Sequence, residues 1–209
     1  MTDSNLTELV CIVDRSGSMG AIQADAEGGL HALLEDQSKQ PGECRLTLAQ
    51  FDNEYDLVHD NAPLGRAVHY RLEPRGTTAL LDAMGRTILA VGQRLANTPE
   101  SQRPGKVIVV IVTDGQENAS VEFSRKRVME MVTHQREAYS WQFVFLAANQ
   151  DAIAEGSSLG IQQGRAMNFR SDGKSVRKAY DTVSRSVLAF RTSGQAEDLL
   201  VPKQADEDD

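Results

Sequence analysis

Short runs of consecutive apolar residues alternate along this chain with longer stretches in which apolar residues recur every three or four positions. The first run, residues 9–13, ends abruptly in Asp14. The longest run, residues 107–112, belongs to the most hydrophobic predicted strand, 106–112, which ends in Thr113-Asp114-Gly115. Continuous apolar runs of this length are typical of parallel strands that are buried on both faces. The three- to four-residue spacing between them predicts amphipathic helices.

The predicted elements follow one another in a regular alternation. Strands are predicted at residues 9–13, 45–51, 55–59, 106–112, 141–147 and 167–169, and helices at 19–39, 78–96, 120–138, 150–159 and 176–190. Strand 55–59 follows strand 45–51 after a link of hairpin length, so this pair is predicted to be antiparallel. The third helix is predicted to start from an N-cap at Ser120. This alternation indicates an α/β fold: a doubly wound, mainly parallel sheet with one short antiparallel edge strand and helices on both faces.

The length of 209 residues suits a single domain. We place this domain at residues 1–193. Beyond Gly194 the chain becomes polar and ends in Asp206-Glu207-Asp208-Asp209. We therefore predict an acidic, disordered tail over residues 194–209.

Composition and charge exclude several classes of function. The chain carries a formal net charge of −8 and only 5% aromatic residues, which argues against a nucleic-acid-binding surface. The N-terminal residues lack the features of a signal peptide, and the longest apolar run is too short to span a bilayer. The two cysteines form no disulfide framework. The sequence thus predicts a cytoplasmic protein that contacts neither membrane nor nucleic acid.

Polar residues follow two of the predicted strands at the edge where parallel sheets bind ligands. Asp14 and Asp114 lie at this edge, Ser16 and Ser18 lie two apart in the turn after Asp14, and the loop Arg75-Gly76-Thr77-Thr78 could reach the same crevice. Carboxylate and hydroxyl oxygens suit a hard cation such as Mg²⁺, with Mn²⁺ or Ca²⁺ as possible substitutes. The cluster contains neither histidine nor cysteine, which counts against zinc. Taken one at a time, these residues could equally be a helix cap and two ordinary turns.

The same residues resemble the motifs of a known family. Val13-Asp14-Arg15-Ser16-Gly17-Ser18-Met19 resembles the D-x-S-G-S-M signature of the von Willebrand factor A (VWA) domain family, Gly76-Thr77-Thr78-Ala79-Leu80 is similar to its G-G-T-x-L loop, and Val112-Thr113-Asp114-Gly115 matches its T-D-G. The resemblance covers about residues 6–193, and points to a small standalone protein of prokaryotic or phage type.

The resemblance implies an intact metal-ion-dependent adhesion site. Ser16, Ser18 and Thr78 would coordinate the metal through their hydroxyls, and Asp14 and Asp114 would act directly or through water. Thr77 stands where the family usually has a second glycine, so either threonine could be the ligand. Thr78 is the better match because it directly precedes Ala79-Leu80.

Three further residues are candidates for the surroundings of the metal. Arg15 places a positive charge beside the site, where it could attract an anionic partner; a solvated side chain is the interpretation we prefer. Asp52 ends the second strand at the same edge, where it could orient the site or simply belong to the hairpin. Glu117 is expected to shape the rim of the face that binds a partner.

These features favour a non-catalytic protein-binding module whose Mg²⁺ accepts an Asp or Glu carboxylate from a partner. Proteins that resemble this one often work beside an AAA+ ATPase or the product of a neighbouring gene in the operon. One alternative is a phosphohydrolase of haloacid-dehalogenase type that uses Asp14 as its nucleophile. That chemistry needs a second carboxylate where Ser16 stands, and a lysine between Lys39 and Lys106, where none occurs. A serine hydrolase is also disfavoured, because the sequence around Ser16 and Ser18 lacks the G-x-S-x-G elbow of that class. A scaffold that no longer binds metal is the remaining alternative.

Overall fold

The sheet of this protein has six strands in the order β3-β2-β1-β4-β5-β6. The computed structural model describes residues 1–64, 70–148 and 151–202. The strands are β1 (Asp3–Asp14), β2 (Glu43–Phe51), β3 (Tyr55–Pro63), β4 (Pro104–Thr113), β5 (Gln142–Ala148) and β6 (Ala166–Phe169). Neighbouring strands are parallel except β2 and β3, which form an antiparallel hairpin at one edge. The predicted fold class is confirmed.

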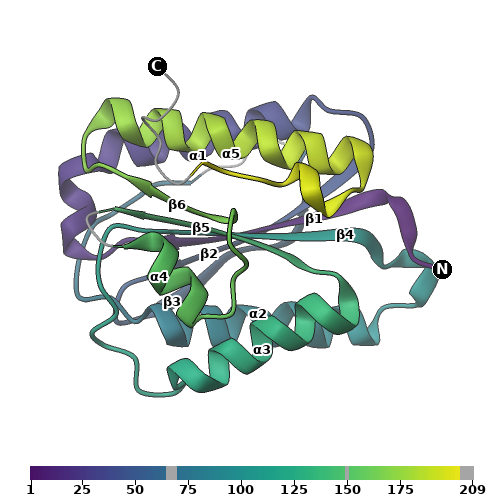
Figure 1. Cartoon of the computed structure of the whole chain (residues 1–209), viewed down its shortest axis with the longest axis horizontal. Helices are drawn as coiled ribbons and strands as arrows, with labels where there is room; N and C mark the ends of the chain where they lie inside the picture. The colour runs from purple at the N-terminus through teal and green to yellow at the C-terminus, as the bar shows by residue number, and fades with distance from the viewer. Residues whose placement is uncertain (65–69, 149–150, 203–209) are drawn as a thin grey trace.

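Helices cover both faces of the sheet (Figure 1). They are α1 (Gln23–Ser38), α2 (Leu80–Asn97), α3 (Arg125–Tyr139), α4 (Ala152–Ser158) and α5 (Gly173–Ser193), with 3-10 turns η1 (Gly17–Ile22), η2 (Glu100–Gln102) and η3 (Ala196–Asp198). Helices α1 and α5 pack side by side on one face, and α2 and α3 lie on the other (Figure 1).

The central strand β1 shows why the apolar runs are continuous. Its residues point alternately to the two faces, so Leu9 and Cys11 belong to the core beneath α1 and α5, whereas Val10 and Ile12 belong to the core above α2 and α3. All four are at most 1% exposed. Burial on both faces thus accounts for the continuous apolar run at residues 9–13 of this strand.

Helices α2 and α3 begin later than the sequence predicts, for reasons that the loop contacts explain. Helix α2 begins at Leu80, because the backbone amide and carbonyl of Thr78 bond to Asn118 and Ala119. Helix α3 begins at Arg125 with Ser124 as its N-cap, so the predicted cap at Ser120 is wrong. The intervening residues instead form a loop whose amides bond to side chains, as described below. The predicted helix 150–159 corresponds to α4, which begins at Ala152. Residue 150 of the prediction lies outside the described residues.

The predicted disordered tail differs from the structure over the part that is described. Residues 196–198 form η3, and Leu199 and Val201 are buried in the core beneath α5. The Val201 amide donates to the Gly164 carbonyl, which fixes this segment beside the start of β6. The prediction failed here because two apolar residues inside an acidic segment suffice to anchor it. Residues 203–209 lie outside the described residues.

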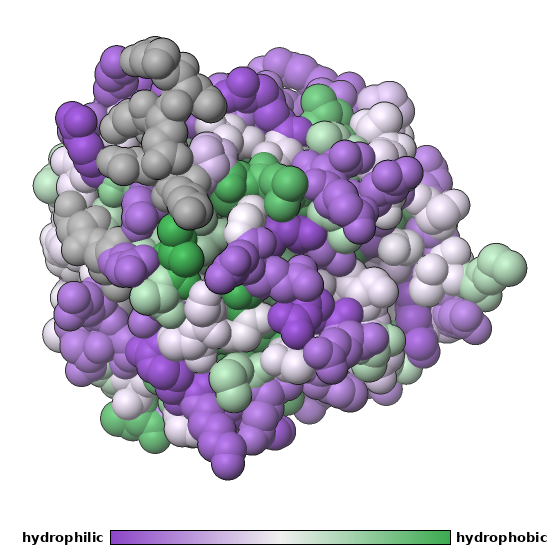
Figure 2. Space-filling model, viewed as in Figure 1, coloured by the Kyte–Doolittle hydropathy of each residue, from purple (hydrophilic) through white to green (hydrophobic). Residues whose placement is uncertain are grey.

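The surface is largely polar on the face that carries α4. Figure 2 shows that hydrophilic residues predominate there and that hydrophobic ones gather only in small areas. Within the described residues, no helix is both long enough and apolar enough to cross a membrane.

Candidate metal centre

Asp14 lies at the carboxyl end of β1, where its side chain is fully buried. Its Oδ1 accepts a hydrogen bond from the Ser16 amide (2.6 Å), and its Oδ2 accepts one from the Thr113 hydroxyl (2.5 Å). Burial raises the pKa of Asp14 to about 6, although the hydrogen bonds from Thr113 and Ser16 lower it, and the nearby Asp114 carboxylate raises it further. Two carboxylates are thus held close together in a setting that favours a compensating cation.

The two serines that follow Asp14 turn their hydroxyls toward Asp114. Ser16 Oγ and Ser18 Oγ lie 3.1 Å apart, and Ser18 Oγ donates to Asp114 Oδ1 at 2.6 Å. Neither serine caps the helix that follows, since the N-cap position of η1 makes no side-chain hydrogen bond. The interpretation of Ser18 as a helix cap is therefore wrong, whereas residues 16–19 do form a turn, closed by the bond from the Met19 amide to the Ser16 carbonyl. Asp114 is itself buried, and burial raises its pKa.

Thr78 reaches the same point from a third loop. A Cβ atom added at Gly115 would lie 2.7 Å from Thr78 Oγ1 and 3.5 Å from the hydroxyls of Ser16 and Ser18. Three hydroxyls from two loops therefore surround the space beside Gly115. Thr78 is 3% exposed, whereas the Thr77 side chain is exposed to solvent. The structure thus brings Thr78, not Thr77, to the two serines.

The serine loop (residues 15–18) and the threonine loop (residues 75–79) are joined by backbone hydrogen bonds. The Gly17 amide donates to the Gly76 carbonyl at 3.2 Å, and the Arg75 amide donates to the Arg15 carbonyl at 2.8 Å. Gly76 has a φ of +68°, a conformation that glycine adopts without strain. These bonds bring the hydroxyls of the two loops together.

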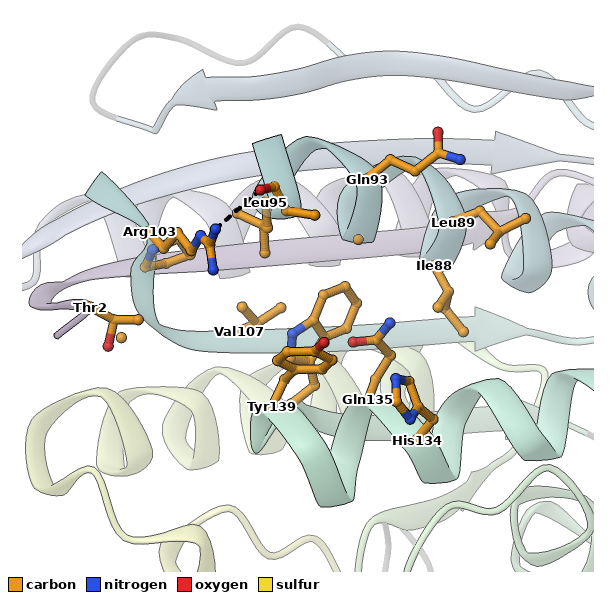
Figure 3. A pocket seen from close by; sticks show the side chains of 15 residues that line it. Thr2, Ile88, Leu89, Gln93, Leu95, Arg103, Val107, His134, Gln135 and Tyr139 are labelled. Atoms are coloured by element: carbon orange, nitrogen blue, oxygen red, sulfur yellow. Dashed lines mark hydrogen bonds between the residues drawn. The ribbon is translucent and has the colours of Figure 1, made fainter. Parts of the chain in front are cut away.

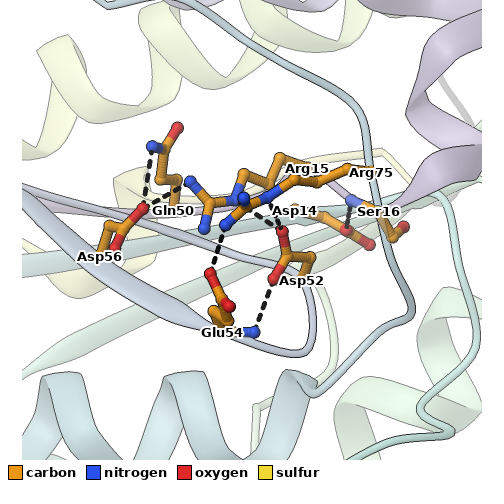
Figure 4. Close-up of polar contacts among 8 residues, drawn as sticks. All are labelled: Asp14, Arg15, Ser16, Gln50, Asp52, Glu54, Asp56 and Arg75. Atoms are coloured by element: carbon orange, nitrogen blue, oxygen red, sulfur yellow. Dashed lines mark hydrogen bonds and ion pairs between the residues drawn. The ribbon is translucent and has the colours of Figure 1, made fainter.

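Arg15 corrects one of the sequence-based interpretations. Its side chain is not solvated: the residue is 5% exposed, Nε donates to Asp52 Oδ2 at 3.0 Å, and Nη1 donates to Asp56 Oδ2 at 2.5 Å (Figure 4). Asp52 is 1% exposed and also accepts from Arg75. Burial alone would raise the pKa of Asp52, but the Glu54 amide and the guanidinium groups of Arg75 and Arg15 hold it below its usual range.

The aspartate loop (residues 114–124) is fastened to the start of α2 by side chains. Glu117 accepts from the amides of Leu81 and Ser120, at 2.9 and 2.8 Å, so it supports the rim from within the loop. Asn118 Oδ1 accepts from the Thr78 amide at 3.0 Å. Asp82 accepts from three consecutive amides of the loop, those of residues 121–123.

Sequence reasoning missed Asp82 and did not predict the bond made by Asn118. The available signal was an acidic residue in the first turn of α2, which usually indicates no more than a favourable interaction with the helix dipole.

The donor set fits a hard divalent cation. It comprises three hydroxyls and two carboxylates, and all its members except Ser18 are buried. In the described part of the chain, no group of three or more His, Cys, Asp or Glu residues could hold a metal. A metal here would therefore depend on hydroxyl ligands, which Mg²⁺ accepts more readily than softer metals do. The exposed Ser18 lies on the side open to solvent.

A cavity of about 440 Å³ lies at the opposite end of the strands from Asp14 and Asp114. It is formed between the C-terminal halves of α2 and α3 and the start of β4 (Figure 3). Its walls include Leu89, Leu95, Val107 and Tyr139, and its lining contains no carboxylate. None of the predicted site residues lines it.

Comparison with solved structures places the fold. Proximal thread matrix protein 1 from the mussel byssus matches 88% of this chain with a TM-score of 0.61 and 12% identity, and a structure of the same protein with a zinc-occupied MIDAS motif matches 87% with 0.61 and 13%. A von Willebrand factor type A protein from Catenulispora acidiphila matches 88% with 0.58 and 13%. The ArnB paralog VWA2 from Sulfolobus acidocaldarius matches 86% with 0.54 and 16%.

The fold is that of a von Willebrand factor type A domain: a Rossmann-like sheet with one antiparallel strand and helices on both faces. The chain spans less than half the length of these proteins, between 43% and 46% of each. No protein-family model matches the sequence. A search of curated proteins also finds no match.

Proposed function

We propose that this protein is a non-catalytic binding module that holds a divalent metal ion, Mg²⁺ by preference, and offers it to a carboxylate of a protein partner. One observation carries the proposal: three hydroxyls and two carboxylates, from loops up to about a hundred residues apart in the chain, meet around Gly115. A structural role alone would not require so many oxygen atoms at one edge of the sheet.

Each residue has a defined part in the proposed site. Ser16, Ser18 and Thr78 hold the metal through neutral hydroxyls, while Asp14 and Asp114 balance its charge directly or through water. When bound, the metal supplies an electrophilic centre for an incoming carboxylate. Because three of the five proposed ligands are neutral hydroxyls, the metal stays electrophilic toward an incoming carboxylate. The solvent side, where Ser18 lies, is the side from which a partner would approach.

The mussel protein supports the assignment of a metal, since its MIDAS motif is described as zinc-occupied. We nevertheless favour Mg²⁺ here because the donors are hydroxyls and carboxylates, which match a hard cation. Mn²⁺ and Ca²⁺ are the expected substitutes.

The hydrolase alternative gains no support from the contacts of Asp14. Both of its oxygens accept hydrogen bonds, from the Ser16 amide and the Thr113 hydroxyl. The residue two positions on is Ser16, whose hydroxyl cannot act as the carboxylic acid that this chemistry needs. We therefore propose docking rather than catalysis.

The partner is proposed to be a protein that presents an Asp or Glu side chain, with an AAA+ ATPase or the product of a neighbouring gene as first candidates. We propose the cytoplasm as the place where the two meet.

Two adjacent threonines provide the sharpest test. We expect Thr78→Ala to weaken Mg²⁺ binding at least tenfold, measured by calorimetry, because it removes a ligand. Thr77→Ala is the matched control, and its affinity should stay within twofold of the wild type. In thermal unfolding, Mg²⁺ should raise the midpoint of the wild type and of Thr77→Ala more than that of Thr78→Ala. No shift of the wild type at millimolar Mg²⁺ would instead identify a scaffold without a metal.

The partner is tested by a pull-down with wild type and Asp14→Ala, in Mg²⁺ and in EDTA. Partners retained only by the wild type in Mg²⁺ support metal-mediated docking. Equal retention under all conditions contradicts it. Turnover of a generic phosphoester that is lost in Asp14→Asn would favour the hydrolase.

A further inference from the structure

Asp52 lies between two of the loops that carry the metal ligands. It directly follows β2, and its side chain accepts hydrogen bonds from Arg15, Arg75 and the Glu54 amide (Figure 4). Oδ2 accepts from Arg15 Nε at 3.0 Å and from Arg75 Nε at 2.7 Å, while the backbone carbonyl accepts from the Ala79 amide at 2.8 Å. Oδ1 accepts from the Glu54 amide at 2.5 Å, which fixes the carboxylate on the hairpin. One residue thus holds both ends of the threonine loop and the first residue of the serine loop.

The residues that Asp52 holds are direct neighbours of the proposed ligands. Arg15 lies between Asp14 and Ser16, and Ala79 directly follows Thr78. The contacts of Asp52 therefore fall on residues directly next to the serine and threonine ligands in the chain. Asp52 and Arg15 are 1% and 5% exposed, so water cannot readily replace either partner.

Close packing leaves the threonine loop little room to move. A Cβ atom added at Gly76 would lie 2.2 Å from Asn53 Oδ1 and 3.3 Å from Asp52 Cβ. The loop therefore rests directly on the tip of the β2–β3 hairpin. The hairpin acts as a fixed support against which the ligand spacing is set.

We propose that Asp52, through Arg15 and Arg75, is a positioning residue that makes the site select Mg²⁺ over Ca²⁺. This inference rests on the metal-binding function proposed above. Mg²⁺ needs oxygens at roughly 2.0–2.1 Å in octahedral geometry, whereas Ca²⁺ takes them at roughly 2.3–2.6 Å with flexible geometry. Loops clamped to one support can hold the smaller ion and resist the expansion that the larger ion requires.

The principal variant is Asp52→Asn, which keeps the size of the side chain and removes its charge. We expect its Mg²⁺ affinity to fall about tenfold, as for other residues that orient metal ligands, with a much smaller loss for Ca²⁺. The measured quantity is the ratio of the two dissociation constants from calorimetry. If Asp52 served stability alone, Asp52→Asn would lower the melting temperature in EDTA. It would then weaken the binding of Mg²⁺ and Ca²⁺ equally and leave the ratio of their dissociation constants unchanged.

A second variant keeps the test valid if Asp52→Asn does not fold. Arg75→Gln removes one of the two guanidinium partners of Asp52. The Arg75 side chain is more than half exposed, so the substitution should not disturb the core. We expect the Mg²⁺ to Ca²⁺ preference to fall severalfold. Arg71→Gln is the matched control, because Arg71 lies in the same segment, is 78% exposed and pairs with Glu73 rather than Asp52. Its ratio should equal that of the wild type.

The two proposals fail in different ways. A wild type that binds neither ion removes the metal site and this inference together. A wild type that binds Mg²⁺, with an unchanged ion ratio in Asp52→Asn or Arg75→Gln, overturns the positioning role and leaves the metal site intact.

Discussion

At the scale of single residues, the site buries carboxylates and hydroxyls, which are groups that usually lie exposed to solvent. Asp14 and Asp114 are buried carboxylates with raised pKa values, at positions where a hydrophobic residue would pack more easily. Gly115 leaves room for the Thr78 hydroxyl, because a Cβ atom added at Gly115 would lie only 2.7 Å from it. Burying such groups costs free energy unless they are paired. In the proposed function, a bound cation would supply the compensating positive charge.

The pKa of Asp14 leads to a prediction for the pH dependence of metal binding. The pKa is raised to about 6 in the folded protein without metal, so a proton competes with the cation below that pH. We expect the apparent Mg²⁺ affinity to fall by about tenfold from pH 7 to pH 5. Calorimetry at the two pH values measures this, and circular dichroism verifies that the fold persists. Equal affinity at both pH values would show that Asp14 does not exchange a proton for the metal.

At the scale of elements, the site depends on loops that side chains hold in place. The aspartate loop has ten residues between Asp114 and the start of α3, and it is fastened to α2 at several points. Asp82 is 6% exposed and receives three amides of the loop. Those amides would otherwise need to form helix or bind water. The loop thus becomes a rigid wall of the site instead of the first turns of a helix.

We expect Asp82→Ala to lower the free energy of unfolding by about 2–3 kcal/mol, because three amides lose a charged acceptor. Urea unfolding in EDTA measures this without a contribution from metal. The control is Asp181→Ala, which removes an exposed ion pair with Arg185 on α5 and should change stability by less than about 0.5 kcal/mol. Similar losses in the two variants would contradict the clamping role of Asp82.

At the scale of the whole molecule, strand order explains where the site forms. From β1 the chain adds β2 and β3 on one side and then crosses to β4 on the other. The order therefore reverses between β1 and β4, and loops leaving the carboxyl ends of these strands diverge to form a crevice. Asp14 and Asp114 emerge at this point. The cavity between α2 and α3 lies at the opposite end of the strands, where β4 begins (Figure 3).

The C-terminal segment completes the core on the face of the sheet that α1 and α5 cover. Leu199 is fully buried, whereas its neighbour Leu200 is 55% exposed. We expect Leu199→Ala to lower the free energy of unfolding by about 2–4 kcal/mol, and Leu200→Ala by less than about 1 kcal/mol. Chemical denaturation of the two variants tests this. A small effect of Leu199→Ala would restore the prediction of a disordered tail from residue 194.

Local sequence determined the strands, the fold class and four of the five residues that the structure brings together, namely Asp14, Ser16, Ser18 and Asp114. Apolar runs such as residues 107–112 are unambiguous because burial on both faces leaves no polar position within them. Asp14, Ser16 and Ser18 lie within five residues, so their motif survives in the linear chain.

Only the tertiary structure decided the features that depend on contacts between distant residues. These are the choice of Thr78 over Thr77, the burial of Arg15 against Asp52, the late start of α3 and the anchoring of Leu199. The reason is the same in each case. Whether a side chain faces solvent, a ligand or another residue depends on partners up to about 100 positions away, and short-range periodicity carries no record of them.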